Sequence, residues 1–151
     1  MLRLSIGLCL LTVGIFLFIA ETFAAQKLSC ESENNGSPQS LEIELEGEKV
    51  IGFSYSGLTP ALDKPHKFSC SLEANRRDGL SEWKDKATQI VIALKEGVSS
   101  EDRVTITKDG NSYNLNFEEI SPSNCGHSST IATSITLVKG KPECQAIEMR
   151  D

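Results

Sequence analysis

The chain has few of the side chains that carry most metal binding and catalysis. Its histidines are His66 and His127, and neither they nor the five cysteines show a zinc-ligand spacing such as C-x-x-C or H-x-x-x-H. A G-x-S-x-G motif and a glycine-rich loop that could hold phosphate are also missing. We therefore expect no metal, no cofactor and no catalytic residues, and a protein that is not an enzyme.

Basic side chains are outnumbered, which argues against two further classes of partner. The 15 lysines and arginines stand against 21 aspartates and glutamates, and the formal net charge is −6. Nucleic acids and anionic membrane surfaces are themselves negatively charged and repel such a protein. We therefore expect a protein partner, and a basic protein fits the charge.

The chain contains one long apolar run, and it lies at the N-terminus. Arg3 precedes the uncharged residues 4–20, and Thr22-Phe23-Ala24 has small residues at the positions that a signal peptidase reads. The run is at the short limit for a membrane span, which needs about 20 residues. We therefore predict a signal peptide over 1–24 and a single exported domain over 25–151, periplasmic or extracellular, with no membrane span after cleavage.

The cysteines predict two disulfides in the exported domain. Cys9 falls in the predicted signal, and Cys30, Cys70, Cys125 and Cys144 remain. An even number of cysteines in a small exported domain indicates a disulfide framework. We favour Cys30 with Cys70 and Cys125 with Cys144, since the second bridge would tie a polar loop to the last strand. The alternative pairs Cys30 with Cys144 and Cys70 with Cys125.

Short alternations of apolar and polar residues predict an all-β fold. Strands are expected over 27–31, 41–45, 50–55, 67–72, 103–107, 112–117, 130–138 and 143–149. Residues 80–96 fit both helical and strand spacing, and we favour a helical turn at 81–85 followed by a strand over 87–95. The expected architecture is a single antiparallel β-sandwich or small barrel of about eight strands, with at most one short helix.

One predicted strand carries a row of carboxylates. Glu42, Glu44 and Glu46 alternate with apolar residues, so they share one face at a spacing of about 7 Å. Such a row is typical of a solvated face that keeps the protein soluble and discourages edge pairing. The functional interpretation is a docking face for a cationic protein.

A small polar loop over 121–129 is the second candidate for recognition. Cys125 anchors it, and Asn124, His127, Ser128 and Ser129 are its candidate partner-binding residues. The alternative is an ordinary exposed connection. Elsewhere, Asn35-Gly36-Ser37 is a sequon for N-glycosylation, which has meaning only in a eukaryotic source.

These features together predict an exported, non-enzymatic binding module. Small exported β-domains that inhibit lysozymes or other hydrolases are similar in size, acidity and use of disulfides, which is a likeness of class and not of motif. We therefore favour an inhibitor of an extracytoplasmic hydrolase. Two alternatives stay open: a structural or envelope-associated protein without a tight soluble partner, and a small secreted hydrolase that uses His66 or His127.

Overall fold

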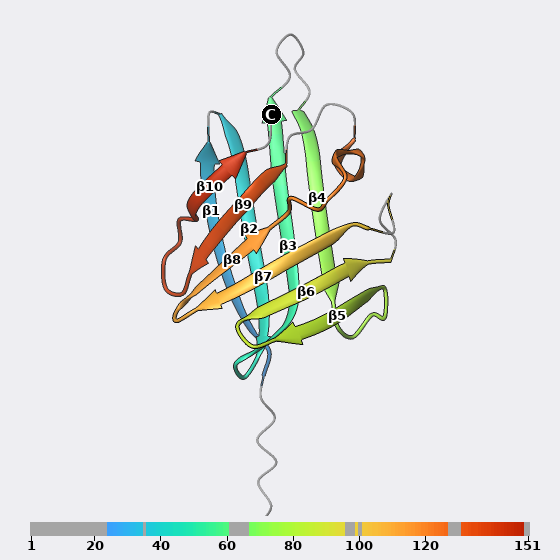
Figure 1. Cartoon of the computed structure of the whole chain (residues 1–151). Coiled ribbons are helices and arrows are strands. Elements are labelled where there is room, and N and C mark those ends of the chain that lie inside the picture. Colours follow the sequence, from blue (N-terminus) through green and yellow to red (C-terminus); the bar gives the residue numbers. More distant parts are fainter. Residues whose placement is uncertain are drawn as a thin grey trace, which may run out of the picture.

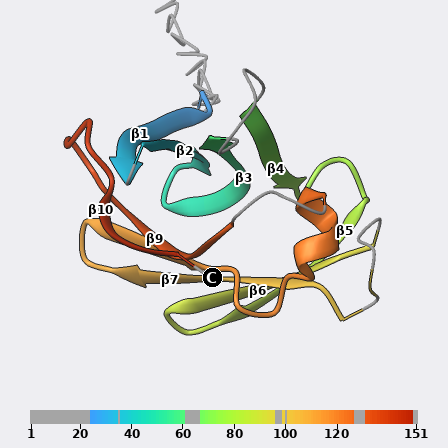
Figure 2. The same cartoon turned by 90° about the horizontal axis from the view of Figure 1, so that it is seen from above.

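The protein folds as two antiparallel β-sheets packed face to face (Figures 1 and 2). The computed structural model describes residues 24–34, 36–60, 67–95, 99, 101–126 and 131–149. No helix in these ranges is long and apolar enough to cross a bilayer. The signal peptide predicted over 1–24 lies outside the described residues except for Ala24 and stays a prediction.

Each sheet is a meander of strands that follow one another in the chain. The four-stranded sheet has the order β1-β2-β3-β4 and the six-stranded sheet the order β10-β9-β8-β7-β6-β5. The strands of the first are β1 (Gln26–Asn34), β2 (Ser37–Glu46), β3 (Lys49–Pro60) and β4 (Lys67–Asn75). The second contains β5 (Ser81–Lys86), β6 (Gln89–Leu94), β7 (Arg103–Asp109), β8 (Ser112–Asn116), β9 (Ala132–Val138) and β10 (Gln145–Met149), with the 3-10 helix η1 (Pro122–Cys125) between β8 and β9. The sheets do not close into a barrel, so the predicted all-β sandwich is confirmed.

Alternation turns one face of each sheet into the core. On β2, Leu41 and Ile43 are buried between half-buried polar neighbours. On β7 and β8, Val104, Ile106 and Leu115 are fully buried in the same way, as their sequence pattern predicts. Seen from above, the two sheets form two layers (Figure 2), and the buried residues of both form one core. The side chains at the intervening positions are left for the outer faces, where a partner can reach them.

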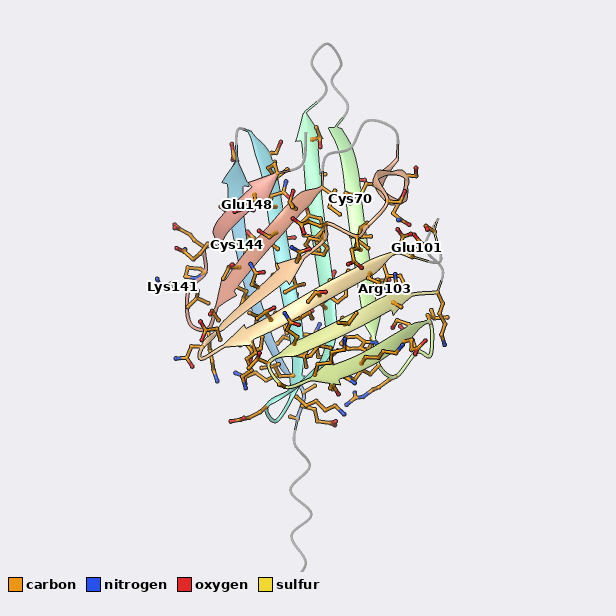
Figure 3. The ribbon with its side chains drawn as sticks, in the orientation of Figure 1. Cys70, Glu101, Arg103, Lys141, Cys144 and Glu148 are labelled. Carbon is orange, nitrogen blue, oxygen red and sulfur yellow. A yellow bond between two sulfur atoms is a disulfide. The ribbon has the colours of Figure 1, made fainter. Side chains whose placement is uncertain are left out.

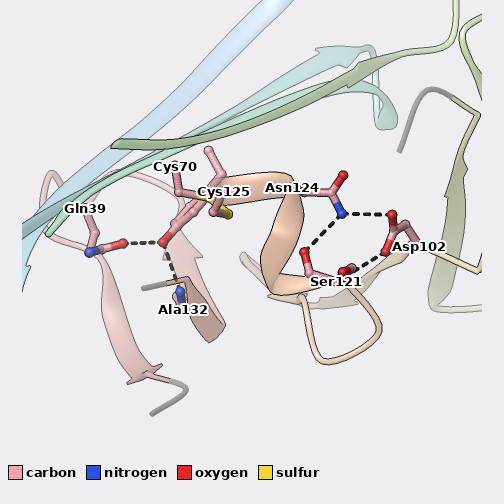
Figure 4. Close-up of a disulfide and its surroundings, with 8 residues drawn as sticks. Gln39, Cys70, Asp102, Ser121, Asn124, Cys125 and Ala132 are labelled. Carbon is pink, nitrogen blue, oxygen red and sulfur yellow. Dashed lines mark hydrogen bonds between the residues drawn. A yellow bond between two sulfur atoms is a disulfide. The ribbon is translucent and has the colours of Figure 1, made fainter. Parts of the chain in front are cut away.

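A buried tyrosine links the two sheets through hydrogen bonds (Figure 4). The Tyr55 hydroxyl donates to the Gln39 side-chain oxygen and accepts the Ala132 backbone N–H at 3.0 Å, and its ring packs against Phe117 with centroids 4.8 Å apart. Gly57 leaves room for this arrangement, because a Cβ there would lie 2.6 Å from Gln39 Oε1 and 2.7 Å from the Tyr55 hydroxyl. A glycine inside a strand commonly marks such a close approach.

The helical turn predicted at 81–85 is wrong, because these residues form β5. Their backbone pairs with β6 from Ser81 opposite Leu94 to Lys86 opposite Gln89, and Ala87, with φ 44°, begins the tight turn between the strands. This hairpin pairs the backbone along its whole length, whereas a single helical turn would leave most N–H and C=O groups unsatisfied. The strand predicted over 87–95 corresponds to the shorter β6.

The favoured disulfide pairing is also wrong, and the alternative holds. Cys30 is bonded to Cys144 and Cys70 to Cys125, with Cα–Cα distances of 4.9 and 4.4 Å. Cys30 and Cys70 lie on β1 and β4, the two edges of the four-stranded sheet, which are three strand spacings or about 14 Å apart. A disulfide spans at most about 7 Å between Cα atoms. The bridges instead tie β1 to the residue before β10 and β4 to η1, at separate places on the sandwich (Figure 3).

Candidate functional site

The outer face of the four-stranded sheet carries an acidic groove of about 270 Å³. Two rows of cross-strand neighbours line it: Glu42, Ser54 and Glu73 in one, and Glu44, Gly52 and Asn75 in the other. Gly52 and Ser54 have the smallest side chains and lie on the central strand, so they form the floor. A Cβ at Gly52 would already lie 3.0 Å from the Asn75 amide nitrogen, so this glycine keeps the groove open.

Two carboxylates of the predicted row already have a cation beside them. Lys27 Nζ lies 2.7 Å from Glu42 Oε1, and the Arg77 guanidinium lies 3.0 Å from Glu46 Oε1. The hydrogen bond and the charge of Glu42 raise the pKa of Lys27. Exposed ion pairs of this kind contribute little to stability, because water and salt screen them. A cation from a partner can therefore replace Lys27 or Arg77 at little cost.

Glu44, Glu73 and Asp78 form no ion pair within 4 Å among the described residues, although Lys27 lies opposite Glu44 on β1. Glu44 accepts a hydrogen bond from the Asn75 amide at 2.9 Å, and Asp78 accepts the Leu80 backbone N–H at 2.7 Å. Glu73 is exposed and forms no ion pair within the described ranges. We call Glu42, Glu44, Glu73 and Asp78 the acidic patch. Sequence reasoning missed its last two members because they belong to β4 and the turn after it, far from β2 in the chain.

The second predicted candidate, the polar loop, is held by a buried carboxylate (Figure 4). Asp102 is 1% exposed and accepts hydrogen bonds from the Asn124 amide at 2.8 Å and from the backbone N–H groups of Ser121 and Ser99 at 2.7 and 2.8 Å. Burial raises the pKa of the Asp102 carboxyl, but these three hydrogen bonds together outweigh burial and leave the pKa below its ordinary value. No apolar or charge pattern around Asp102 indicates this role in the sequence.

Asn124 thus positions the loop, since its amide also donates to the Ser121 carbonyl at 3.1 Å. His127, Ser128 and Ser129 lie outside the described residues, and their contact with a partner stays a prediction. Asn35 of the sequon lies outside them as well.

A second groove joins the acidic patch to this loop. It has a volume of about 320 Å³ and lies between β4 and the β5–β6 side of the other sheet, with Leu80, Leu94 and Asn124 among its lining residues. Both grooves are lined by Glu73 and Asp78. The two candidates that the sequence places far apart therefore meet in one surface that wraps around β4.

The chemistry available in the described part of the chain is charge and hydrogen bonding. There, no three histidine, cysteine, aspartate or glutamate side chains are grouped to hold a metal ion, and Cys125 and Cys144 are oxidised in separate bridges. Comparison of the chain with models of protein families, with curated proteins and with solved structures found no match.

Proposed function

We propose that this protein is an exported, non-enzymatic binding module that captures a basic protein through the surface around β4. The partner class we favour is a basic extracytoplasmic hydrolase such as a lysozyme, which the module would inhibit by covering it. The observation that carries the proposal is the continuity of the two grooves through Glu73 and Asp78.

Rigidity supports a role in recognition. The Cys70–Cys125 bridge fixes η1 to β4, and Asp102 fixes the same loop from the other side. A surface that is already ordered loses little conformational entropy when a partner binds. The two disulfides also fit the oxidising environment of an exported protein.

Binding to a purified basic lysozyme tests the proposal. We expect the mature, oxidised protein to bind it and to slow its hydrolysis of cell walls, and to bind more weakly at about 1 M NaCl than at about 0.1 M, where the Debye length is about 10 Å. The triple variant Glu42→Gln, Glu44→Gln, Glu73→Gln should raise Kd by about tenfold or more, because three charge interactions of about 0.5 to 1 kcal/mol are lost.

A matched control removes two carboxylates at β10, away from both grooves. Glu143 and Glu148 are exposed and line neither groove, so Glu143→Gln with Glu148→Gln should leave Kd unchanged. Equal Kd values for the triple variant and this control would show that the acidic patch does not bind the partner. Cell-wall hydrolysis by the protein alone would overturn the non-enzymatic assignment.

A further inference from the structure

The outer edge of β4 carries backbone groups that no other described strand pairs. β4 is the last strand of its sheet, and the Arg76 N–H donates to the Ile51 carbonyl at 2.8 Å in the same register as the β3–β4 ladder. Antiparallel strands alternate between residues that bond to the neighbour and residues that point away. Ala74 and Leu72, which lie two and four residues before Arg76, therefore bond to β3. Ser71 and Glu73 are the alternate residues, so their N–H and C=O groups point to the open edge.

This edge is open over a defined length. The Cys70–Cys125 bridge holds η1 against β4 at one end, and the turn over 76–80 leaves the sheet at the other. Between them lie five residues, 71–75, which span about 17 Å of strand. Many proteins cover such an edge or protect it with a lysine, because unpaired strand edges attract other chains. Here the open stretch carries Glu73 and no lysine.

The second groove provides an apolar contact beside the same edge. Leu72, Leu80 and Leu94 line it, and Leu80 is 49% exposed, the most exposed large apolar side chain in the described part of the chain. A strand added along β4 would place alternate side chains on two sides. One set would lie next to Glu73 on the outer face, and the other would enter the groove at Leu80 and Leu94.

Charge decides which occupant fits this edge. Glu73 and Asp78 line both sides of it, so a basic segment is attracted. A second copy of this chain, paired antiparallel through its own β4, would bring two Glu73 carboxylates into one short ladder, and like charges across strands are destabilising. The geometry and the charge thus favour a foreign basic segment over self-association.

We propose that β4 accepts an extended segment of the partner as an additional strand, in which basic side chains alternate with apolar ones. The basic side chains bind at Glu73 and Asp78, and the apolar side chains fill the groove between Leu80 and Leu94. This proposal rests on the proposed function, because it names the part of the partner that the β4 surface recognises.

A synthetic peptide tests this mode of binding directly. The probe is a capped hexapeptide that alternates lysine and valine, and its control alternates glutamate and valine. We expect the lysine peptide to shift the backbone amide resonances of residues 71–75 and to slow the hydrogen exchange of Ser71 and Glu73, while the glutamate peptide does neither. In a third peptide, the lysine peptide is N-methylated at every second residue, where the backbone N–H would face β4. It keeps its side chains and should lose about tenfold or more in affinity.

Two variants of one residue separate edge pairing from side-chain contact. Ser71→Pro removes an N–H that points to the open edge, and prolines are tolerated at such edge positions. Ser71→Thr keeps the N–H. We expect Ser71→Pro to lower the affinity for the lysine peptide by about tenfold, and Ser71→Thr to bind the peptide like the wild type.

The outcomes distinguish this proposal from the one on which it rests. If lysozyme binds with salt dependence but the lysine peptide leaves residues 71–75 unshifted, or if the N-methylated peptide binds as well as its parent, edge pairing is wrong and the binding module stands. If neither lysozyme nor the peptide binds, both proposals fail. A dimer in sedimentation experiments that Ser71→Pro abolishes would replace the basic segment with a second copy of the chain.

Discussion

The carboxylate of Asp102 and the amide of Asn124 meet at 2.8 Å in a part-buried position, although 22 positions separate them in the chain. Asp102 precedes β7, and Asn124 belongs to η1, so this contact ties the start of a core strand to the loop beside β4. The loop is therefore fixed from two directions, by Asp102 and by the Cys70–Cys125 bridge. Loss of either should loosen η1 without removing the core.

Replacing Asp102 by asparagine should lower the free energy of unfolding by about 2 kcal/mol at pH 7. The NH₂ group of the new asparagine would replace one carboxylate oxygen and face the donors that this oxygen now accepts. These are either the Ser121 N–H, or the Asn124 amide and the Ser99 N–H. Denaturant titration measures the loss. Asp109→Asn is the matched control, because Asp109 is exposed at the end of β7, directly before the Gly110-Asn111 turn, so neither side chain is buried there. Equal losses in the two variants would contradict a special role for Asp102.

The same carboxyl predicts the direction of acid sensitivity. Its pKa is lower in the folded protein than the ordinary value of about 4 in the unfolded chain. The unfolded state therefore takes up a proton first as the pH falls, and the stabilisation by Asp102 is present above about pH 4 and is lost as the pH falls through the folded pKa. The difference in unfolding free energy between the wild type and Asp102→Asn should stay constant from about pH 5 to 8 and shrink below about pH 4. A difference that grows in acid would refute this.

The Tyr55 hydroxyl offers a test at the opposite end of the pH scale. Tyr55→Phe leaves the buried Ala132 N–H without its acceptor and should cost about 2 kcal/mol at pH 7. Burial raises the pKa of Tyr55, against a smaller opposite effect of the Ala132 hydrogen bond. Because the unfolded tyrosine ionises first, at about pH 10, the wild type loses this stabilisation as the pH rises above that value. The gap between the wild type and Tyr55→Phe should therefore narrow in alkali.

Tyr113→Phe serves as the control for this prediction. Tyr113 is also buried, but its hydroxyl forms no hydrogen bond with another residue of the described ranges, so its removal should change the unfolding free energy by less than about 0.5 kcal/mol. Unfolding curves for the two variants, measured side by side at neutral pH, would contradict the account if they coincided.

Peptide mapping without reduction checks the disulfide pairing. We expect linked peptides that contain Cys30 with Cys144 and Cys70 with Cys125. The bridges close loops of 114 and 55 residues, which correspond in the chain-entropy model to about 5 and about 4 kcal/mol. Cys70→Ser with Cys125→Ser should lower the unfolding free energy by about 4 kcal/mol and also weaken partner binding, because η1 is released from β4. A peptide linking Cys30 to Cys70 would contradict the fold.

The sequence predicts the parts of this fold that depend on local alternation. The inward positions of β2, β7 and β8 follow from strict alternation, and the tight turn of Gly110 and Asn111 between β7 and β8 follows from its residues. The disulfide pairing depends on which strands end up at the sheet edges, and that is settled by packing between distant segments. β5 shows no apolar alternation, because it is a charged edge strand whose conformation depends on pairing with β6.

For the same reason, only half of the candidate surface could be predicted from the sequence. The row on β2 is a local pattern and could be predicted, and Glu42 and Glu44 do line the groove. Glu73 and Asp78 complete it only because β3 pairs with both β2 and β4 and brings all three strands into one sheet. Asp102 stands between Glu101 and Arg103, and a charged run is ordinarily exposed, so nothing local signals its burial.

The Arg76 side chain holds the turn from β4 to β5, and the fluorescence of Trp83 can monitor this contact. Arg76 donates from Nε to the Val50 carbonyl at 2.9 Å, forms an ion pair with Asp85, and lies 4.5 Å from the centroid of the Trp83 ring. A lysine cannot make the three contacts together, because it lacks the planar, multivalent guanidinium. We expect Arg76→Lys to cost about 1 to 2 kcal/mol and to shift Trp83 fluorescence to the red as the ring becomes more hydrated.

Arg77→Lys is the matched control, since the Arg77 side chain is exposed and its partner among the described residues is Glu46, an ion pair that a lysine can keep. It should leave the fluorescence maximum unchanged and the unfolding free energy within about 0.5 kcal/mol of the wild type. Because Arg76 directly follows the open edge of β4, its loss should also make the position of Asp78 less fixed and lower the affinity for a basic partner. An Arg76→Lys protein with unaltered Trp83 fluorescence would show that the guanidinium does not cover the ring in solution.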